Sequence, residues 1–214
     1  MNPHPSFLHR WWRWLLAATA GLILVYSLTP TQNAKRETPN AQQPDYAADR
    51  ALKDSLWRYA PDSPLPDSSR ARFTGLRYFP PDPKWRVAAR YDAFPTPTPL
   101  LIPIHNAEAP EPYLRVARLS FTLNGRACTL TALRRPTEPS AAPLFIPFTD
   151  ASNGLTTYGG GRYLDVPAPT PGQSTLLLDF NQAYAPTCAH VPDYLCPVPP
   201  PENHLPIPIE AGER

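Results

Sequence analysis

Residues 113–133 read YLRVARLSFTLNGRACTLTAL, and they carry the strongest indication of the fold. Asn124-Gly125 lies between two runs in which apolar and polar residues alternate. Such a pair favours a two-residue hairpin turn, because both turn positions need positive φ. The turn would pair Leu123 with Arg126, Phe121 with Cys128, and Leu119 with Leu130. This register places Cys128 among core apolar residues, so we expect it to be a small buried hydrophobe.

Other strand patterns surround the hairpin. Residues 85–92 alternate with a period of two, and residues 100–105 form a short apolar run between prolines, which is typical of an edge strand. The remaining strand candidates are residues 73–79, 144–148, 156–166 and 174–180. About seven short strands, without an alternating helix pattern, predict a mainly β fold: a single compact β-sandwich or squat barrel.

One helix is predicted before the strands. Asp45 is placed to cap it, and Pro61 would end it. The apolar residues that recur at roughly helical spacing are Tyr46, Ala47, Leu52, Leu56 and Tyr59, and Trp57 joins them near the end. We expect the helix to pack against the sheet rather than to carry chemistry.

The first 28 residues predict a transmembrane anchor. Arg10 and Arg13 give a positive flank, Trp11, Trp12 and Trp14 lie beside them, and residues 15–28 are uncharged and mostly apolar. This run is shorter than the roughly 20 residues of an ordinary span, although the tryptophans extend it. A cleaved signal peptide is the alternative. We favour an uncleaved anchor in the cell membrane, with a single pass and the C-terminal domain outside the cytoplasm, in the periplasm or at the cell surface.

The remaining chain divides into a linker and a domain. Residues 29–44 are polar and predict a flexible linker, and residues 45–214 predict one β-rich domain. The 32 prolines lie between apolar runs and indicate loops and strand edges. A net charge of +2 gives no reason to expect a nucleic-acid partner.

Three successive glycines mark the first candidate site. Tyr158 is followed by Gly159-Gly160-Gly161 and Arg162. Glycines within a strand pattern indicate a bulge or the close approach of a ligand or another backbone. Their N–H groups beside Arg162 would suit an anion. We therefore assign Tyr158, Gly160 and Arg162 to a predicted ligand site.

Carboxylates and amides near this segment form the second candidate site. Asp179 and Asn181 follow the next strand candidate, and they could converge with Arg162. A buried Arg–Asp pair that fixes the strand end is the structural alternative, and we favour it over catalysis. Glu202, together with Asp179 or Asp165, would supply a general acid/base pair. Asn203 completes the predicted ligand-binding residues Tyr158, Gly160, Arg162, Asn181 and Asn203.

Cys188 and Cys196 predict a disulfide, because paired cysteines in an exported protein usually close a loop. A redox-active thiol pair is a second interpretation, although the spacing is not Cys-x-x-Cys. A metal site that adds His190 and His204 is the third, and its spacing fits no standard zinc pattern. We therefore expect neither a metal nor a cofactor.

Three long motifs carry a resemblance to a known family. They read PFTDASNGLTTYGGGRYLDV, LDFNQAYAPTCAHVPDYLCPVPPPEN and IPIEAGER. With upstream pieces such as FTGLRYF, the chain resembles the bacterial domain-of-unknown-function family 1684 over about residues 45–213. The resemblance implies an exported, often membrane-anchored protein. Ala185 and His190 depart from the family, which usually has Asn and often an aromatic residue at those positions.

Three functions compete at this stage. The first is a binding or structural module for a small polar or anionic ligand. The second is an envelope hydrolase, with Asp179 or Asp165 as the base and Glu202 as the acid. The third is a purely architectural role for the same residues.

Overall fold

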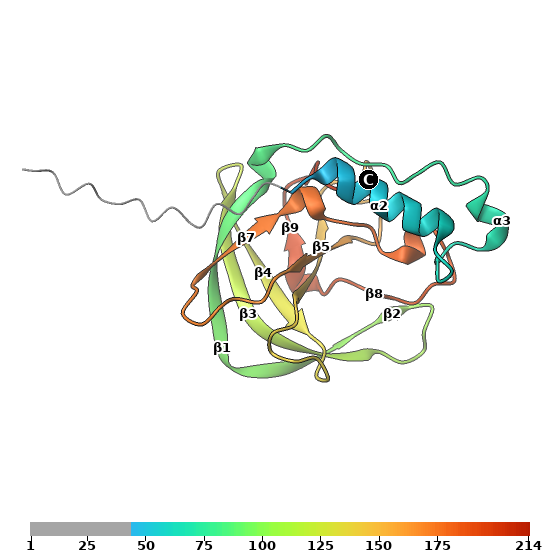
Figure 1. The fold of residues 1–214 in the computed structure, drawn as a ribbon. Helices are drawn as coiled ribbons and strands as arrows, with labels where there is room; N and C mark the ends of the chain where they lie inside the picture. The colour runs from blue at the N-terminus through green and yellow to red at the C-terminus, as the bar shows by residue number, and fades with distance from the viewer. Residues whose placement is uncertain (1–43) are drawn as a thin grey trace, which may run out of the picture. The chain divides into compact units, whose positions relative to one another are not determined.

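The computed structural model describes residues 44–214. Its helices and strands are labelled in Figure 1. In chain order, with short 3-10 helices marked η, they are α2 (Tyr46–Tyr59), α3 (Asp67–Arg70), η1 (Pro83–Trp85), β1 (Arg86–Ile102), β2 (Ile104–His105), β3 (Glu111–Leu123), β4 (Arg126–Arg134), β5 (Leu144–Asp150), β6 (Arg162–Val166), β7 (Thr175–Asp179), η2 (Phe180–Gln182), η3 (Thr187–Ala189), β8 (Cys196–Pro197), η4 (Pro201–Asn203) and β9 (His204–Leu205).

The main sheet has the strand order β6-β5-β4-β3-β1-β7, and it curls on itself (Figure 1). Tyr163 of β6 exchanges backbone hydrogen bonds with Tyr184, a few residues beyond β7, and this bridge connects the two ends of the curl. The mainly β prediction is confirmed. Of the two predicted forms, the structure is closer to the barrel. The described residues contain no second large sheet, so the sandwich is wrong.

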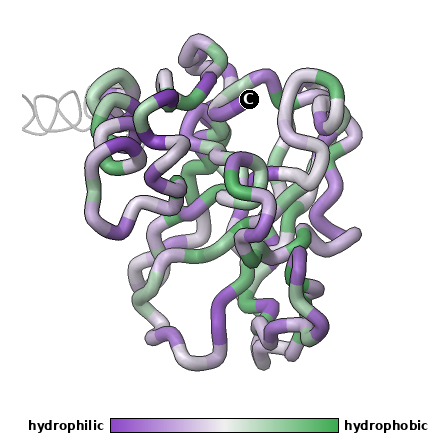
Figure 2. The backbone as a smooth tube through the Cα atoms, turned by 90° about the vertical axis from the view of Figure 1, so that its right-hand side faces the viewer, coloured by the Kyte–Doolittle hydropathy of each residue, from purple (hydrophilic) through white to green (hydrophobic). Residues whose placement is uncertain are grey.

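The hairpin prediction is confirmed in its register. β3 and β4 pair Leu123 with Arg126, Phe121 with Cys128, and Leu119 with Leu130. Asn124 and Gly125 both have positive φ, as the turn requires. Cys128 is buried in the main core beside strand residues. Hydrophobic and hydrophilic residues alternate along much of the chain (Figure 2).

β1 joins two strands that the sequence indicated separately. Its register against β3 shifts between Ala93 and Thr98, where Pro95 and Pro97 lie. Proline cannot donate to a ladder, so pairing is interrupted there without ending the strand. Ile104–His105 forms the separate strand β2, which pairs only with β8.

One strand prediction is wrong, and a second is right only in its C-terminal part. Residues 73–79 form no strand, apart from one bridge from Tyr78 to Glu213. Residues 156–161 form turns, so β6 begins only at Arg162.

The C-terminal residues 204–214 form an extended segment, here called the C-terminal strap. Its buried residues alternate with exposed ones. The buried apolar side chains are Leu205, Ile207, Ile209 and Ala211, and all four belong to the main core; Gly212 and Glu213 after them are buried as well. The strap's end lies beside α2 (Figure 1).

Helix α2 begins after the predicted cap, where the Asp45 side chain accepts a hydrogen bond from Ala48 N–H. The predicted packing face is right only at Tyr46 and Trp57. Leu52, Leu56 and Tyr59 are exposed, whereas Tyr46 and Trp57 are buried. The buried side follows Tyr46, Arg50, Lys53 and Trp57, a spacing of three to four residues that places them on one helix face.

The predicted anchor and linker lie outside the described residues. Within residues 44–214, no helix is long and apolar enough to cross a membrane.

Candidate functional site

A cavity of about 400 Å³ lies between helix α2 and the segment around η2, and we call it the helix pocket. Its size falls in the range typical of small-molecule sites. The side chains that define its chemistry are Tyr46, Arg50, Lys53, Trp57, Tyr78 and Tyr184. The pocket therefore combines two cations and an aromatic wall with one lining carboxylate, Asp49.

Within the described part of the chain, Arg50 is a cation without a carboxylate partner. Its guanidinium donates to Phe79 O at 3.1 Å and to Asn181 O at 3.5 Å, and it lies 4.4 Å from the centre of the Tyr78 ring. Among the described residues, no Asp or Glu oxygen lies within 4.0 Å of it. Burial lowers the pKa of Arg50, and the charges of Tyr78 and Tyr46 oppose this shift. An anion in the pocket would complete its coordination.

Lys53, in contrast, is neutralised by Glu213. The Lys53 Nζ lies 2.8 Å from Glu213 Oε2, and the other carboxylate oxygen accepts from His190 Nε2 at 2.8 Å. The Glu213 side chain is fully buried. Although burial alone would raise the pKa of Glu213, the hydrogen bond from His190 and the pair with Lys53 outweigh it and hold the pKa below its usual value.

This arrangement predicts an acid-sensitive fold. The folded pKa of Glu213 is below its unfolded value, roughly 4.3, so its stabilising contribution is present above that value and is lost as the pH falls through the folded pKa. We expect Glu213→Gln to lose about 2 kcal/mol of unfolding free energy at neutral pH. Urea denaturation at several pH values should show the difference from wild type shrinking below about pH 4.

Glu210→Gln is the matched control, because Glu210 is exposed in the same strap. Its stability should follow the wild type at every pH. Parallel curves for wild type and Glu213→Gln would contradict the assignment to Glu213.

The hydroxyl of Tyr78 is buried and has no hydrogen-bond partner within the described part of the chain. Burial raises the pKa of Tyr78 well above its usual range, so the hydroxyl stays protonated. Burial, followed by the hydrogen bond to Asp179, also raises the pKa of Tyr46 to about 12. Because Tyr46 donates to Asp179 at 2.6 Å, Tyr78 is the phenol free to bond a ligand.

The structure places Arg162 in the core rather than in a ligand site. It is fully buried, and it donates to Asp150 Oδ2 at 2.9 Å. It also donates to three backbone carbonyls of the C-terminal strap, those of Ile209, Ala211 and Glu213. A buried Arg–Asp pair was the favoured alternative, but its partner is Asp150 and not Asp179.

The glycines make room for the chain itself. A Cβ at Gly160 would lie 2.5 Å from Cε1 of Tyr158, so the Tyr158 ring occupies that space. A Cβ at Gly161 would lie 2.6 Å from Phe148 O and 2.8 Å from Pro199 Cγ. The Tyr158 hydroxyl lies 3.8 Å from Cys188 Sγ. The close approach indicated by the glycines therefore involves protein groups.

Asp179 and Asn181 are held by structural contacts at the start of β1. Asp179 accepts from Tyr46 and lies 3.2 Å from Arg86 Nε, opposite Arg86 in the β1–β7 pair. Asn181 bonds Asp82 N–H and C=O through its amide, and it bonds the Asp179 carboxylate. These bonds use both ends of the Asn181 amide.

Glu202 pairs instead with Arg115 at 2.7 Å, and Arg115 lies opposite Thr98 of β1. Thr98 lies 12 residues along β1 from Arg86, the partner of Asp179, so Glu202 and Asp179 contact different parts of this strand. Asp165 has a third environment, where it accepts from the Tyr184 hydroxyl at 2.8 Å. The structure thus gives the three predicted catalytic carboxylates separate partners.

Asn203 is fully buried and connects β4 with β5. Its amide accepts from Thr131 N–H and donates to the carbonyls of Thr131 and Pro147. β4 and β5 share a single paired position, Leu133 with Phe145, so Asn203 supplies bonds where the ladder is open.

The predicted disulfide is absent from the structure. Cys188 and Cys196 are buried free thiols, and Cys196 Sγ accepts from Cys188 N–H at 3.2 Å. Burial raises the pKa of Cys196 to about 12, which disfavours the thiolate needed for redox chemistry. Within residues 44–214, no three His, Cys, Asp or Glu side chains are grouped to hold a metal. His190 binds Glu213, and His204 bonds Thr149.

The sequence interpretation missed the helix pocket. Arg50, Lys53 and Trp57 were assigned to no site, and Glu213 was only part of a motif. One sequence pattern could have indicated the pocket. Tyr46, Arg50, Lys53 and Trp57 recur at helical spacing, so two cations and two aromatic residues share one face of the helix.

Comparison with known proteins gives a family but no activity. Among curated proteins, none matches the sequence. A solution NMR structure of an uncharacterized protein from Haloarcula marismortui, from gene locus rrnAC0354, is similar at 38% sequence identity and a TM-score of 0.63. The alignment covers 78% of this chain and 91% of that chain. The model of the family "Protein of unknown function (DUF1684)" matches residues 71–214, and the chain therefore belongs to the DUF1684 family.

Proposed function

We propose that the domain is a binding module whose helix pocket takes a small anion with a planar, apolar body. The observation that carries the proposal is Arg50, a guanidinium at an aromatic pocket with no carboxylate within ion-pair distance among the described residues. A carboxylate or phosphate would accept from it in the planar geometry that arginine favours.

The aromatic wall favours a ligand with a flat body. Trp57, Tyr78 and Tyr184 line the same cavity as Arg50. Aromatic rings prefer offset or edge-to-face contacts with other rings, which add to the area buried. The unpartnered Tyr78 hydroxyl offers a hydrogen bond that fixes the orientation of the ligand.

The separate partners of Asp165, Asp179 and Glu202 give no support to the hydrolase alternative. Binding without catalysis is therefore the better interpretation. If the N-terminal segment is the predicted membrane anchor, the pocket would face the outside of the cytoplasm and meet exported or environmental anions.

Benzoate is a suitable probe, with benzyl alcohol as its uncharged counterpart. Isothermal titration calorimetry of the full-length chain should show benzoate binding and much weaker binding of benzyl alcohol. Arg50→Gln should weaken benzoate binding about 10- to 100-fold, because charge-assisted hydrogen bonds contribute about 1.5–3 kcal/mol.

Arg58→Gln is the matched control. Arg58 lies on the same helix, stacks near Tyr59 and Phe73, and is not among the pocket's lining residues. It should bind benzoate like the wild type. Equal losses in both variants, or unchanged binding in a folded Arg50→Gln protein, would reject the helix pocket as the site.

A further inference from the structure

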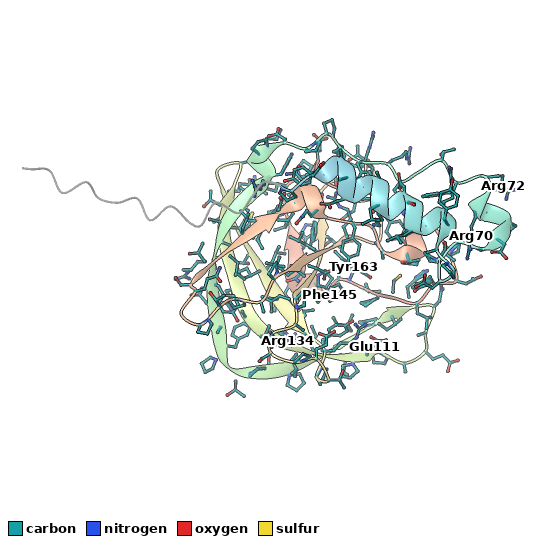
Figure 3. The ribbon with its side chains drawn as sticks, in the orientation of Figure 1. Arg70, Arg72, Glu111, Arg134, Phe145 and Tyr163 are labelled. Carbon is teal, nitrogen blue, oxygen red and sulfur yellow. The ribbon has the colours of Figure 1, made fainter. Side chains whose placement is uncertain are left out.

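A second cavity, of about 480 Å³, shares Tyr184 with the helix pocket. We call it the tyrosine pocket. Its defining side chains are Tyr113, Phe145, Tyr163, Tyr184, Asp165 and Arg135. Figure 3 shows Phe145 and Tyr163 close together, with Arg134 and Glu111 labelled below them.

The four aromatic residues form a continuous series. The ring centres of Tyr113 and Phe145 are 5.7 Å apart, and those of Phe145 and Tyr163 are 4.9 Å apart. The Tyr163 and Tyr184 centres are 5.6 Å apart. The last two pairs meet nearly edge to face, so neighbouring rings are turned relative to one another. Turned rings around one cavity can present several electron-rich faces to the same ligand.

The charged residues of the cavity leave one carboxylate without a cation. Arg135 lies near Glu138 at 3.8 Å and is paired with Glu111 at 3.2 Å. Asp165 is exposed, and it has no Lys, Arg or His nitrogen within 4.0 Å among the described residues. The lining thus holds one cation, Arg135, against two anions, Glu138 and Asp165.

The electrostatic environment agrees with this charge balance. Although Asp165 as a whole is exposed, partial desolvation of its carboxyl beside the aromatic wall raises its pKa. The hydrogen bond from Tyr184 opposes this shift, and the Glu138 charge reinforces it. A cation beside Asp165 would relieve both unfavourable effects. The cavity already shows the type of contact involved, since the Arg135 guanidinium lies 5.2 Å from the centre of the Tyr113 ring.

One hydroxyl in the pocket has no partner. Tyr163 donates to Pro197 O, and Tyr184 donates to Asp165. Tyr113 is only 1% exposed, and its hydroxyl makes no hydrogen bond of acceptable geometry within residues 44–214, although the Arg135 guanidinium lies near enough to oppose the rise that burial causes in its pKa. A buried hydroxyl without a partner loses its hydrogen bonds to water, so a ligand that bonds it would recover that loss.

We propose that the tyrosine pocket binds a small methylated ammonium compound, with Asp165 as its counter-ion, the four aromatic rings around its methyl groups, and Tyr113 bonding a hydroxyl of the ligand. This site is distinct from the helix pocket and selects the opposite charge. A methylated ammonium fits better than a primary one, because aromatic side chains form much of the lining and Asp165 is the one lining carboxylate without a cation partner among the described residues. A primary ammonium needs three acceptors, whereas a methylated one needs aromatic faces.

The test compares two probes of the same shape. (2-Hydroxyethyl)trimethylammonium carries the charge, and 3,3-dimethylbutan-1-ol replaces its nitrogen by carbon. Titration of the full-length chain should show the cation binding at least about tenfold more tightly than the alcohol. Asp165→Asn should weaken cation binding about tenfold and leave alcohol binding unchanged.

Two controls separate this site from the helix pocket. Asp49→Asn removes a carboxylate at the helix pocket and should leave cation binding unchanged. Asp165→Asn should keep benzoate binding, because its change lies in the other cavity. Tyr113→Phe, which keeps the ring, should weaken the hydroxylated cation but not tetramethylammonium.

Three results would overturn the proposal. They are equal affinities for the cation and the alcohol, unchanged cation binding in Asp165→Asn, and no cation binding at concentrations well above about 1 mM. If benzoate still binds in any of these cases, the proposal for the helix pocket is retained and only the proposal for the tyrosine pocket is rejected.

Discussion

Replacing Arg162 by methionine should lower the free energy of unfolding by about 3–5 kcal/mol. This is a large fraction of the 5–15 kcal/mol typical of a folded domain. Methionine keeps much of the apolar volume, so the loss would come from the missing polar contacts rather than from a cavity. Urea denaturation followed by circular dichroism measures the change directly.

The reason is the number of buried groups that depend on this side chain. Without the guanidinium, the Asp150 carboxylate keeps only N–H donors such as those of Ser152 and Ile209, and the Ile209, Ala211 and Glu213 carbonyls lose a charged donor. A buried charge that loses its partner costs more than the pair contributes. Arg162→Lys should also destabilise the protein, because one ammonium cannot reproduce the planar set of donors that the guanidinium provides.

Arg115→Gln is the matched control for the loss of one arginine. It breaks the partly exposed pair with Glu202, and it should cost about 0–1 kcal/mol. In the double variant Arg162→Met/Asp150→Asn, the leftover buried charge is gone, so part of the loss should be recovered. If Arg162→Met matches Arg115→Gln in stability, the strap is not held by Arg162.

The parts of the fold that were predictable rest on local patterns. The β3–β4 register follows from Asn124-Gly125 and the alternation around it, and the helix start follows from Asp45. Each of these signals acts over a few residues. The curl of the sheet does not, because the bridge that joins its ends pairs Tyr163 with Tyr184, on opposite sides of β7 in the sequence.

The candidate site depends on contacts between distant parts of the chain. Lys53 and Glu213 are 160 positions apart, and Tyr46 and Asp179 are 133 apart. Helical spacing placed Leu52 and Leu56 on the packing face, but both are exposed. A prediction from hydrophobicity alone misplaces these two leucines, because the buried side of α2 includes the apolar stems of Arg50 and Lys53 as well as the aromatic rings of Tyr46 and Trp57.

The C-terminal strap shows a further limit. Its apolar residues alternate in the sequence, but Pro206 and Pro208 lie between them and cannot donate to a strand ladder. In the structure, the Arg162 side chain supplies hydrogen bonds that a neighbouring strand would otherwise provide. A long-range bond of this kind leaves no local pattern.

Gly212→Ala should destabilise the protein by about 3–5 kcal/mol. Gly212 has φ +71°, and a Cβ there would lie 2.8 Å from Phe180 O and closer still to Ala183 O. Ala183 O also accepts from Glu213 N–H at 2.8 Å, so the backbone cannot move aside without breaking that bond. The strap's end would therefore separate from the η2 segment.

Gly172→Ala isolates the steric part of this effect. Gly172 has a similar φ of +80°, but a Cβ there would meet nothing within 4 Å. The free energy of unfolding of Gly172→Ala should fall by only about 1–2 kcal/mol, which is the cost of placing an alanine in the left-handed conformation. The difference between the two variants in urea denaturation then measures the close packing of the strap against η2. Because Lys53 of the helix pocket is paired with Glu213, Gly212→Ala should also weaken benzoate binding, whereas Gly172→Ala should not. Equal stability of the two variants would show that Gly212 serves only the backbone conformation.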